Sequence, residues 1–400
     1  ARKKVLALSE KYGMRVDPDA LIEDISVGMQ QRVEILKMLY RDNEILIFDE
    51  PTAVLTPQET DKLFAVLRTM RDDGKAIVII THKMHEVEAL SDRVAVLRHG
   101  QFVGDMLTRE TDAQEMTNMM VGHAVTLNID RPDPVDPKPR IEVKNLTVRS
   151  IDGIVKLDDV SFTANSGEIL GIAGISGCGQ KELLEAISGL QKLEEGSKIT
   201  YIEPDGSECL LNGMDPLDII RKGLLLSFVP EDRFGMGLVG GMNIIQNIML
   251  RTYRRGKGPI TDRKFPRDLS QKIVDDLEVV TPDIGRTPIR RLSGGNVQKV
   301  LVGREIASAP NVLMSAYAVR GLDINTSYTI YNLMTEQKMK GVAVIFVGED
   351  LDVLLELCDR ILVLCGGKVS GIVDARTATK EEIGLMMTRV GGGKEEAVHA

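Results

Sequence analysis

The sequence predicts an α/β fold with a mostly parallel sheet, present in two tandem copies. Three observations predict it: similar segments recur at a constant separation, short apolar runs end in polar residues, and one such run leads through a glycine-rich turn into a helical pattern. Apolar runs of this length are typical of strands buried in a parallel sheet. A chain of 400 residues exceeds one ordinary core, so two domains are expected.

The recurrence has a single offset of 267 residues. The matching stretches are 25–40 (ISVGMQQRVEILKMLY) with 292–307 (LSGGNVQKVLVGREIA), 45–56 (ILIFDEPTAVLT) with 312–323 (VLMSAYAVRGLD), and 91–100 with 358–367. The offset holds without a gap from residue 26 to residue 120. A match of this length indicates a tandem duplication.

The duplication predicts domain limits. We expect part of the first copy at 1–125, a linker at 126–139 and the second copy at 140–400. The four prolines between Asp130 and Arg140 lack N–H donors and fix φ, which predicts a stiff, extended linker; the alternative is an ordinary surface loop. Because the second copy begins near Arg140, the offset also predicts that the first copy is incomplete, lacking roughly 130 residues at its start.

Composition narrows the class of protein. Apolar residues make up 43% and charged residues 27% of the chain, as in soluble globular proteins. A net charge of −9 argues against a general nucleic-acid binder, and no apolar run is long enough to predict a membrane span. The cysteines form no C-x-x-C pair and are expected to be buried thiols in a reducing compartment: Cys178, Cys209, Cys358 and Cys365.

A phosphate-binding loop is predicted in the second copy. An apolar strand at 168–173 leads through a glycine-rich turn into a helix at 183–190. Glycines let backbone N–H groups converge, and the start of a helix favours an anion. The expected ligand-binding residues are Gly174, Ser176, Gly177, Gly179, Gln180, Lys181 and Glu182.

This loop departs from a working one. Such a loop has lysine where Gln180 stands and serine or threonine where Lys181 stands. Gln180 therefore supplies no positive charge, and Lys181 cannot coordinate magnesium. The alternative is a glycine-rich strand–helix turn that binds nothing.

A serine-led turn opens a helix in each copy. Ser26 and Ser293 are expected N-caps, and the free N–H groups behind them suit a γ-phosphate. The alternative is a capped amphipathic helix without a ligand. The expected ligand-binding residues are Ser26, Gly28 and Gln31 in the first copy, and Ser293, Gly294, Gly295 and Gln298 in the second.

Acidic residues follow a predicted parallel strand of the first copy, Ile45–Phe48. Ligands of open α/β sheets bind at the carboxyl ends of strands, where Asp49 and Glu50 lie. We expect Asp49 to hold magnesium and Glu50 to orient or deprotonate a water for in-line attack on phosphorus. His82, after a second apolar run, is expected to contact the γ-phosphate and that water; the alternative is a histidine satisfied within the fold.

The second copy lacks these groups. At the same offset, Asp49, Glu50 and His82 become Ala316, Tyr317 and Glu349, while the strands and glycines remain. This selective loss predicts that the second copy keeps a structural role and completes the site of its partner.

Together these motifs resemble those of the ATP-binding cassette (ABC) ATPases of transporters. The signatures are SVGMQQR and LSGGNVQK, the Walker B motif is ILIFDEPT, the switch is THK, and GISGCGQKE is similar to a Walker A loop. Within that superfamily the chain resembles the tandem-domain ATPases of bacterial sugar and nucleoside importers, and most of all the nucleoside-import branch. The resemblance covers nearly the whole chain.

The resemblance implies two tandem ABC ATPase (P-loop NTPase) domains with helical subdomains, paired head to tail, with ATP and Mg²⁺ as cofactors. It implies one competent site, with Asp49, Glu50 and His82 closed by the turn at Ser293, and one degenerate site, with the loop at 174–182 closed by the turn at Ser26. Two residues depart from the family pattern: Thr56 stands where aspartate is usual, and Glu231 stands at the nucleotide-contacting position where glutamine is usual.

The implied function is an ATP-hydrolysing subunit that energises import. Its partners would be integral membrane permeases and, indirectly, an extracytoplasmic substrate-binding protein, with no nucleic acid. It would lie peripherally on the cytoplasmic face of the inner membrane. Two alternatives are a non-transport ABC ATPase of translation or DNA repair and a catalytically silent nucleotide-binding scaffold. We expect the 400-residue chain alone to be inactive, because the first Walker A loop is absent.

Overall fold

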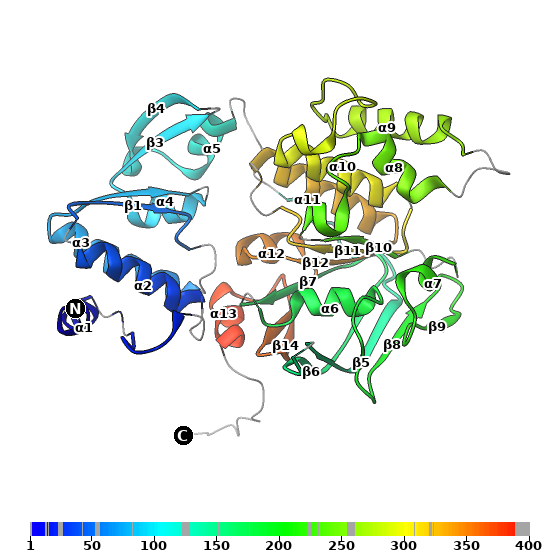
Figure 1. Ribbon diagram of the computed structural model, residues 1–400, viewed down its shortest axis with the longest axis horizontal. Helices are drawn as coiled ribbons and strands as arrows, with labels where there is room; N and C mark the ends of the chain where they lie inside the picture. Colours follow the sequence, from blue (N-terminus) through cyan, green and yellow to red (C-terminus); the bar gives the residue numbers. More distant parts are fainter. Residues whose placement is uncertain are drawn as a thin grey trace. The chain divides into compact units, whose positions relative to one another are not determined.

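The structure is a computed structural model of the chain (Figure 1). It describes residues 2–12, 14, 16–22, 27–41, 43–52, 57–81, 83–98, 100–121, 129–150, 152–175, 177–221, 226–230, 232–253, 261–307, 309–319, 322 and 324–388. The chain divides into two compact units, Ala1–Leu127 and Asn128–Ala400.

The first unit combines helices with two small sheets. Its elements are α1 (Arg2–Lys11), α2 (Val27–Tyr40), β1 (Ile45–Asp49), α3 (Pro57–Asp72), β2 (Ala76–Ile80), α4 (Met84–Leu90), β3 (Arg93–Arg98), β4 (Gln101–Leu107), η2 (Thr108–Glu110) and α5 (Ala113–Val121). β1 pairs with β2 in parallel, and β3 pairs with β4 antiparallel. The parallel strand expected at Ile45–Phe48 is therefore confirmed.

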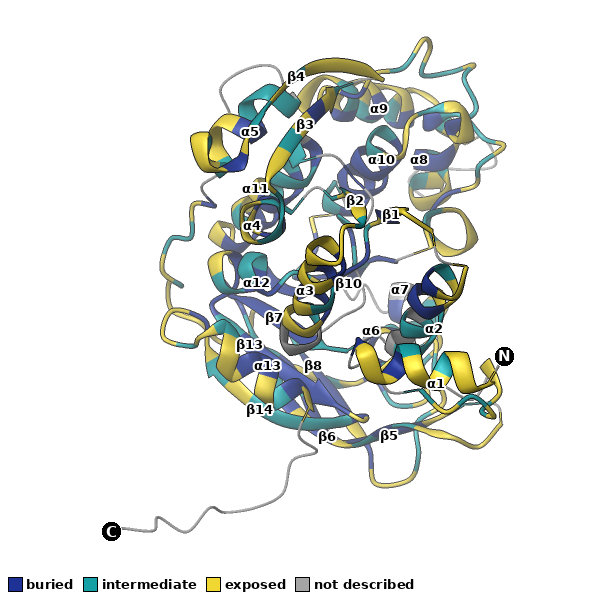
Figure 2. Cartoon of the chain, turned by 90° about the vertical axis from the view of Figure 1, so that its left-hand side faces the viewer, coloured by how far each residue is buried: buried dark blue, intermediate teal, exposed yellow. Residues whose placement is uncertain are grey.

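The burial expected for this strand is wrong on one face. Leu46 and Phe48 pack with side chains of α2 and α3, whereas Ile45 and Ile47 are 64% and 60% exposed (Figure 2). Successive residues of a strand point to opposite faces, so helices on one side bury only every second residue. Among the described residues of this unit, no layer covers the other face of β1.

The second unit is larger and has two sheets. Its elements are β5 (Pro139–Arg149), β6 (Val155–Asn165), β7 (Ile169–Gly174), α6 (Gln180–Ile187), β8 (Lys198–Ile202), β9 (Glu208–Leu210), α7 (Pro216–Arg221), β10 (Leu226–Val229), η3 (Arg233–Gly237), α8 (Ile244–Thr252), α9 (Lys264–Asp276), η5 (Ile289–Arg291), α10 (Gly294–Ile306), β11 (Val312–Ala316), α11 (Ile324–Met339), β12 (Ala343–Val347), α12 (Leu351–Leu357), β13 (Arg360–Cys365), β14 (Lys368–Asp374) and α13 (Lys380–Thr388).

The main sheet of this unit has the order β10-β11-β12-β7-β13-β14. Its pairings are parallel except that of β13 with β14. A separate antiparallel sheet has the order β6-β5-β8-β9. Figure 1 shows α10 and α11 on one side of the main sheet, and α6 with the antiparallel sheet on the other.

Both faces of the main sheet are therefore buried. One core lies between the sheet and helices that include α10 and α11, and a second lies between the sheet, α6 and the antiparallel strands. Val312 and Met314, the counterparts of Ile45 and Ile47, belong to the second core and are completely buried. The same strand is thus covered on two faces in one unit and on one face in the other.

The proline-rich segment packs against the second unit. Residues 129–138 have no regular secondary structure, and β5 then begins at Pro139. Arg131 donates from Nη1 to the carbonyls of Leu355 and Cys358 at 2.7 and 2.6 Å. Arg376 forms an ion pair with Asp133 at 2.6 Å. Because these bonds anchor the segment, it is a docked strap.

The cysteines differ in burial from what the sequence predicts. Cys358 and Cys365 are buried, but Cys178 and Cys209 are only partly so, because they lie on a loop and on the short outer strand β9. Among the described residues, every helix is too short or too polar to cross a bilayer.

Candidate functional site

The carboxyl end of β1 has an unusual backbone turn. Glu50, directly after the strand, has φ of 47°, and its N–H donates to the carbonyl of Ile80 at 2.9 Å. Tyr317, its counterpart in the second unit, has φ of 49° and donates to the carbonyl of Val347 at 3.1 Å. A non-glycine residue in this left-handed region costs about 1 kcal/mol or more. The fold therefore maintains the same kink in both units, independently of the side chain.

The side chains at this kink differ in chemistry. In the first unit Asp49 is exposed and Glu50 is partly exposed, so both carboxylates face solvent at the end of a parallel strand. Carboxylate oxygens are the donors that Mg²⁺ prefers, so Asp49 fits the cation role expected for it. In the second unit the equivalent residue, Ala316, is buried and offers no donor. Grouped metal ligands of three or more residues do not occur among the described positions.

A buried carboxylate that the sequence analysis missed connects the two strand ends of the first unit. Glu86, in the first turn of α4, is 3% exposed. It accepts hydrogen bonds from the hydroxyls of Thr52, after β1, and of Thr81, after β2, the latter at 3.0 Å. Lys83 lies 3.4 Å from the same carboxylate. Glu86 thereby holds together the loops that follow Glu50 and that contain His82.

The second unit has lost this network as well. The residues 267 positions after Thr52, Thr81 and Glu86 are Val319, Gly348 and Val353. A comparison of the two copies could have singled out Glu86, because a Glu-to-Val difference accompanies the loss of the strand-end acids. Its partners lie far apart in the chain, so no single motif contains it.

The glycine-rich turn of the second unit lies between β7 and α6, as the sequence predicts. Gly177 and Gly179 have φ of 87° and 100°, a region that favours glycine. A Cβ atom on Gly179 would lie 2.5 Å from Leu157 Cδ2 and 2.7 Å from the Lys156 carbonyl oxygen. Gly179 is thus required by packing as well as by conformation, whereas Gly177 borders open space.

Gln180 and Lys181 have different roles at the start of α6. The Gln180 side chain is buried, and its Nε2 donates to the Ile175 carbonyl at 3.1 Å, so it clips the loop. Lys181 is 54% exposed and lies 3.8 Å from Glu185. Glu182 occupies the first turn of the helix. The helix begins at Gln180 and ends at Ile187, earlier at both ends than the expected 183–190.

The serine-led turn of the second unit caps α10. Ser293 Oγ accepts from the Asn296 N–H at 3.4 Å and from Asn296 Nδ2 at 2.8 Å, which confirms the N-cap. Gly294 and Gly295 form the first turn, and Arg233 Nη1 donates to the Gly294 carbonyl at 3.4 Å. Gln298 is buried, and neither atom of its amide has a hydrogen-bond partner among the described residues.

Some predicted site residues fall outside the described positions. They are Ser26, His82, Ser176 and Glu231. Gly28 and Gln31 lie in α2, but the Gln31 side chain is not described. The roles assigned to these residues stay predictions.

Comparison with known proteins identifies the family. The family described as ABC transporter matches residues 1–53 and 157–315. The chain is 38% identical over 400 residues to the nucleoside import ATP-binding protein NupA of Lactococcus lactis subsp. cremoris, a match that covers 99% of this chain and 77% of that protein.

This chain belongs to the ABC transporter family. It is also 39% identical to the glucose import ATP-binding protein TsgD13 of Haloferax volcanii, over 99% of this chain and 71% of that protein. Among solved structures it is similar to the dimeric ATP-binding cassette MJ0796 bound to ADP and Pi, with a TM-score of 0.51 and 23% identity over 60% of this chain and all of that one. This ABC transporter family member therefore has the α/β fold of ABC ATPases, a P-loop NTPase fold with mixed sheets.

Proposed function

We propose that the chain is an ATP-binding and ATP-hydrolysing subunit of an importer for simple sugars or nucleosides. The observation that carries the enzymatic part is the pair Asp49 and Glu50, present at one of two geometrically matching strand ends. Similarity over nearly the whole chain to relatives named for nucleoside and glucose import supports the transport role. These relatives favour transport over translation or DNA repair, and their similar identities leave the cargo class open.

The first unit would carry the chemistry. Asp49 would hold Mg²⁺ beside the phosphates, where the ion would offset their negative charge. Glu50 would accept a proton from the water whose oxygen attacks the γ-phosphorus, as the bond to the β-phosphate oxygen breaks and ADP leaves. His82 would orient that water and the γ-phosphate. Glu86, through Thr52 and Thr81, would position the loops on either side of the attacking water.

The second unit would act as the complement. Its capped turn at Ser293, with Gly294 and Gly295, presents free N–H groups at the start of α10, which is suited to a phosphate. We propose that hydrolysis at Glu50 depends on this turn, and that the turn at Ser26 has the corresponding role for the degenerate loop. Gln31, Gln298 and Glu231 would contact nucleotide in the same scheme.

We further propose that the chain contains two tandem ABC domains, of which the first is an incomplete copy. Support comes from apolar side chains that are exposed on β1 and β2 while their counterparts on β11 and β12 are completely buried. The exposed residues are Ile45, Ile47, Val78 and Ile80, and the counterparts are Val312, Met314, Ile345 and Val347. In the second unit, α6 and the antiparallel sheet cover this face. A similar layer would complete the first unit.

The proposed partners are membrane permease subunits and, through them, an extracytoplasmic binding protein. The chain would be peripheral, on the cytoplasmic face of the inner membrane. The basic stretch from Arg251 to Lys264 would be a contact with the permease; a solvated loop is the alternative, and residues 254–260 lie outside the described positions.

The test uses the complete transporter in vesicles, with phosphate release as the measurement. Glu50→Gln should lower hydrolysis by about 100-fold or more, since it removes the general base. Tyr317→Ala, at the matching kink, should leave hydrolysis largely intact. Equal losses in both variants would contradict the assignment of a single active site. The 400-residue chain alone should release no phosphate above background, and robust release that Glu50→Gln abolishes would refute the incompleteness of the first unit.

A further inference from the structure

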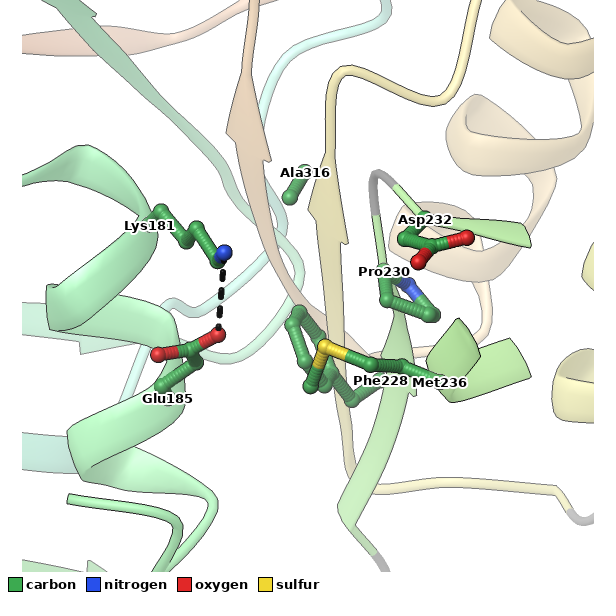
Figure 3. A pocket seen from close by; sticks show the side chains of 7 residues that line it. All are labelled: Lys181, Glu185, Phe228, Pro230, Asp232, Met236 and Ala316. Carbon is green, nitrogen blue, oxygen red and sulfur yellow. Dashed lines mark ion pairs between the residues drawn. The ribbon is translucent and has the colours of Figure 1, made fainter. Parts of the chain in front are cut away.

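A cavity of about 340 Å³ lies beside the glycine-rich turn of the second unit. Figure 3 shows Lys181 and Glu185, both on α6, facing Pro230, Asp232 and Met236 across it, with Ala316 at the end of β11. Its apolar lining includes Phe228 and Met236. The cavity is thus bordered by the start of a helix and by the carboxyl ends of β10 and β11, where ligands of α/β sheets bind.

The donor set of this cavity does not fit a divalent cation. Mg²⁺ requires oxygen ligands in near-octahedral geometry. Ala316 replaces the strand-end carboxylate, and Lys181 replaces the hydroxyl that would follow the loop. An ammonium group repels a cation, so Lys181 opposes metal binding and does more than omit a ligand.

The two carboxylates that line the cavity are already engaged. Glu185 accepts a hydrogen bond from Gln191 Nε2 at 2.7 Å and pairs with Lys181. Asp232 Oδ1 accepts from the N–H groups of Phe234 and Gly235 at 3.1 and 2.8 Å, which caps η3. Recruiting either carboxylate to a metal would break these bonds.

Lys181 supplies positive charge at the position of the missing ion. Its ammonium group lines the cavity one residue after the clipped Gln180, and its contact with Glu185 is 3.8 Å long. Ion pairs between side chains this exposed contribute little, so the ammonium group can turn toward an anion at low cost. The loop N–H groups and the start of α6 favour that anion further.

We propose that this cavity binds the polyphosphate chain of a nucleoside di- or triphosphate without a divalent cation, with the Lys181 ammonium group in place of Mg²⁺. The inference rests on the proposed nucleotide-binding function and adds that the two units differ in their requirement for metal. With alanine and tyrosine at the strand end, the cavity has no carboxylate there to deprotonate a water, so the bound nucleotide stays intact.

Equilibrium dialysis of ATP against the 400-residue chain tests this, at constant ionic strength, with excess Mg²⁺ or with EDTA. We expect the Kd to change by less than about threefold between the two conditions. Lys181→Met should weaken binding in EDTA by about tenfold or more, the scale of one charge-assisted hydrogen bond. Lys192→Met, a matched change at an exposed lysine outside the cavity lining, should leave the Kd unchanged.

The outcomes separate the two proposals. Binding that requires Mg²⁺ would overturn the metal-free site and leave the nucleotide-binding function standing. Metal-free binding that Lys181→Met does not weaken would overturn the role of this lysine. Absence of ATP binding in both conditions would overturn nucleotide binding at this cavity altogether. Lys181→Thr, which restores a hydroxyl, should bind more tightly with Mg²⁺ than with EDTA; the opposite order would count against the inference.

Discussion

Removing the charge of Lys338 should strongly destabilise the second unit. Its ammonium group lies 2.7 Å from Asp359 Oδ1, and the two side chains are 1% and 6% exposed. It also donates to the carbonyl of Pro132, and Asp359 Oδ2 accepts from the Ile169 N–H at 2.8 Å. The pair therefore ties α11 and the end of α12 to the start of β7 and to the strap before β5.

The duplication provides a matched pair in another environment. Arg71 and Asp92, 267 residues earlier, are 3.3 Å apart with side chains that are 43% and 77% exposed. Lys338→Met leaves a buried carboxylate without its counter-charge and should lower the free energy of unfolding by about 3–5 kcal/mol. Arg71→Met should lower it by less than about 1 kcal/mol, because solvent screens exposed charges.

Thiol labelling can measure this in the second unit alone. All four cysteines lie there, and Cys358 precedes Asp359 in the chain. Burial raises the pKa of the Cys358 thiol, so maleimide reacts with it only when the unit opens. With tenfold per 1.4 kcal/mol, Lys338→Met should accelerate labelling of Cys358, read by peptide mass, by about a hundredfold to several thousandfold. Hydrogen exchange of β1 and β2 reports the effect of Arg71→Met.

The reasoning fails if Lys338→Met accelerates labelling by less than about tenfold, or if the two variants destabilise their units equally. Adding Asp359→Asn to Lys338→Met removes the orphaned charge and keeps an acceptor for the Ile169 N–H. This double variant should recover more than half of the lost stability. A double variant less stable than Lys338→Met would show that something other than the unpaired charge is responsible.

Three further predictions follow from the same comparison of sites. Gly179→Ala meets Leu157 and the Lys156 carbonyl and should cost more than about 2 kcal/mol, against about 1 kcal/mol for Gly177→Ala, which is strained but meets nothing; equal labelling of Cys358 in the two variants would refute this. Met314→Thr should cost about 2–4 kcal/mol and Ile47→Thr less than about 1 kcal/mol by urea unfolding, because only Met314 is buried; a larger loss for Ile47→Thr would mean that its strand face is covered. Glu86→Gln should speed hydrogen exchange next to Thr52 and Thr81 by about tenfold, while Glu88→Gln, on the exposed side of the same helix, should not; equal exchange would remove Glu86 from its positioning role.

Several features of the fold could be predicted because they are encoded in neighbouring residues. The apolar run at 45–48, the glycine-rich turn before α6 and the cap at Ser293 each depend on a few consecutive side chains. Strand propensity, positive φ and capping are local properties, so a short window is sufficient. The duplication added the comparison of Asp49 and Glu50 with Ala316 and Tyr317, which no single motif contains.

Other features depended on contacts between distant residues. The burial of β1 on one face only was mispredicted, because an apolar run does not specify how many layers will cover it. Glu86 was missed, because its partners Thr52 and Thr81 follow two different strands. Lys181 was recognised as a residue that cannot bind magnesium, but its place beside the cavity required the fold.

The sequence by itself determined that the chain is duplicated, which strand ends carry acids, and where helices begin. Only the tertiary structure decided that both units share one backbone kink, that the remaining acids of the second cavity are engaged, and that one ion pair is buried while its counterpart is exposed. The physical reason is that local conformation depends on adjacent residues, whereas burial and electrostatic strength depend on what the rest of the chain places around them.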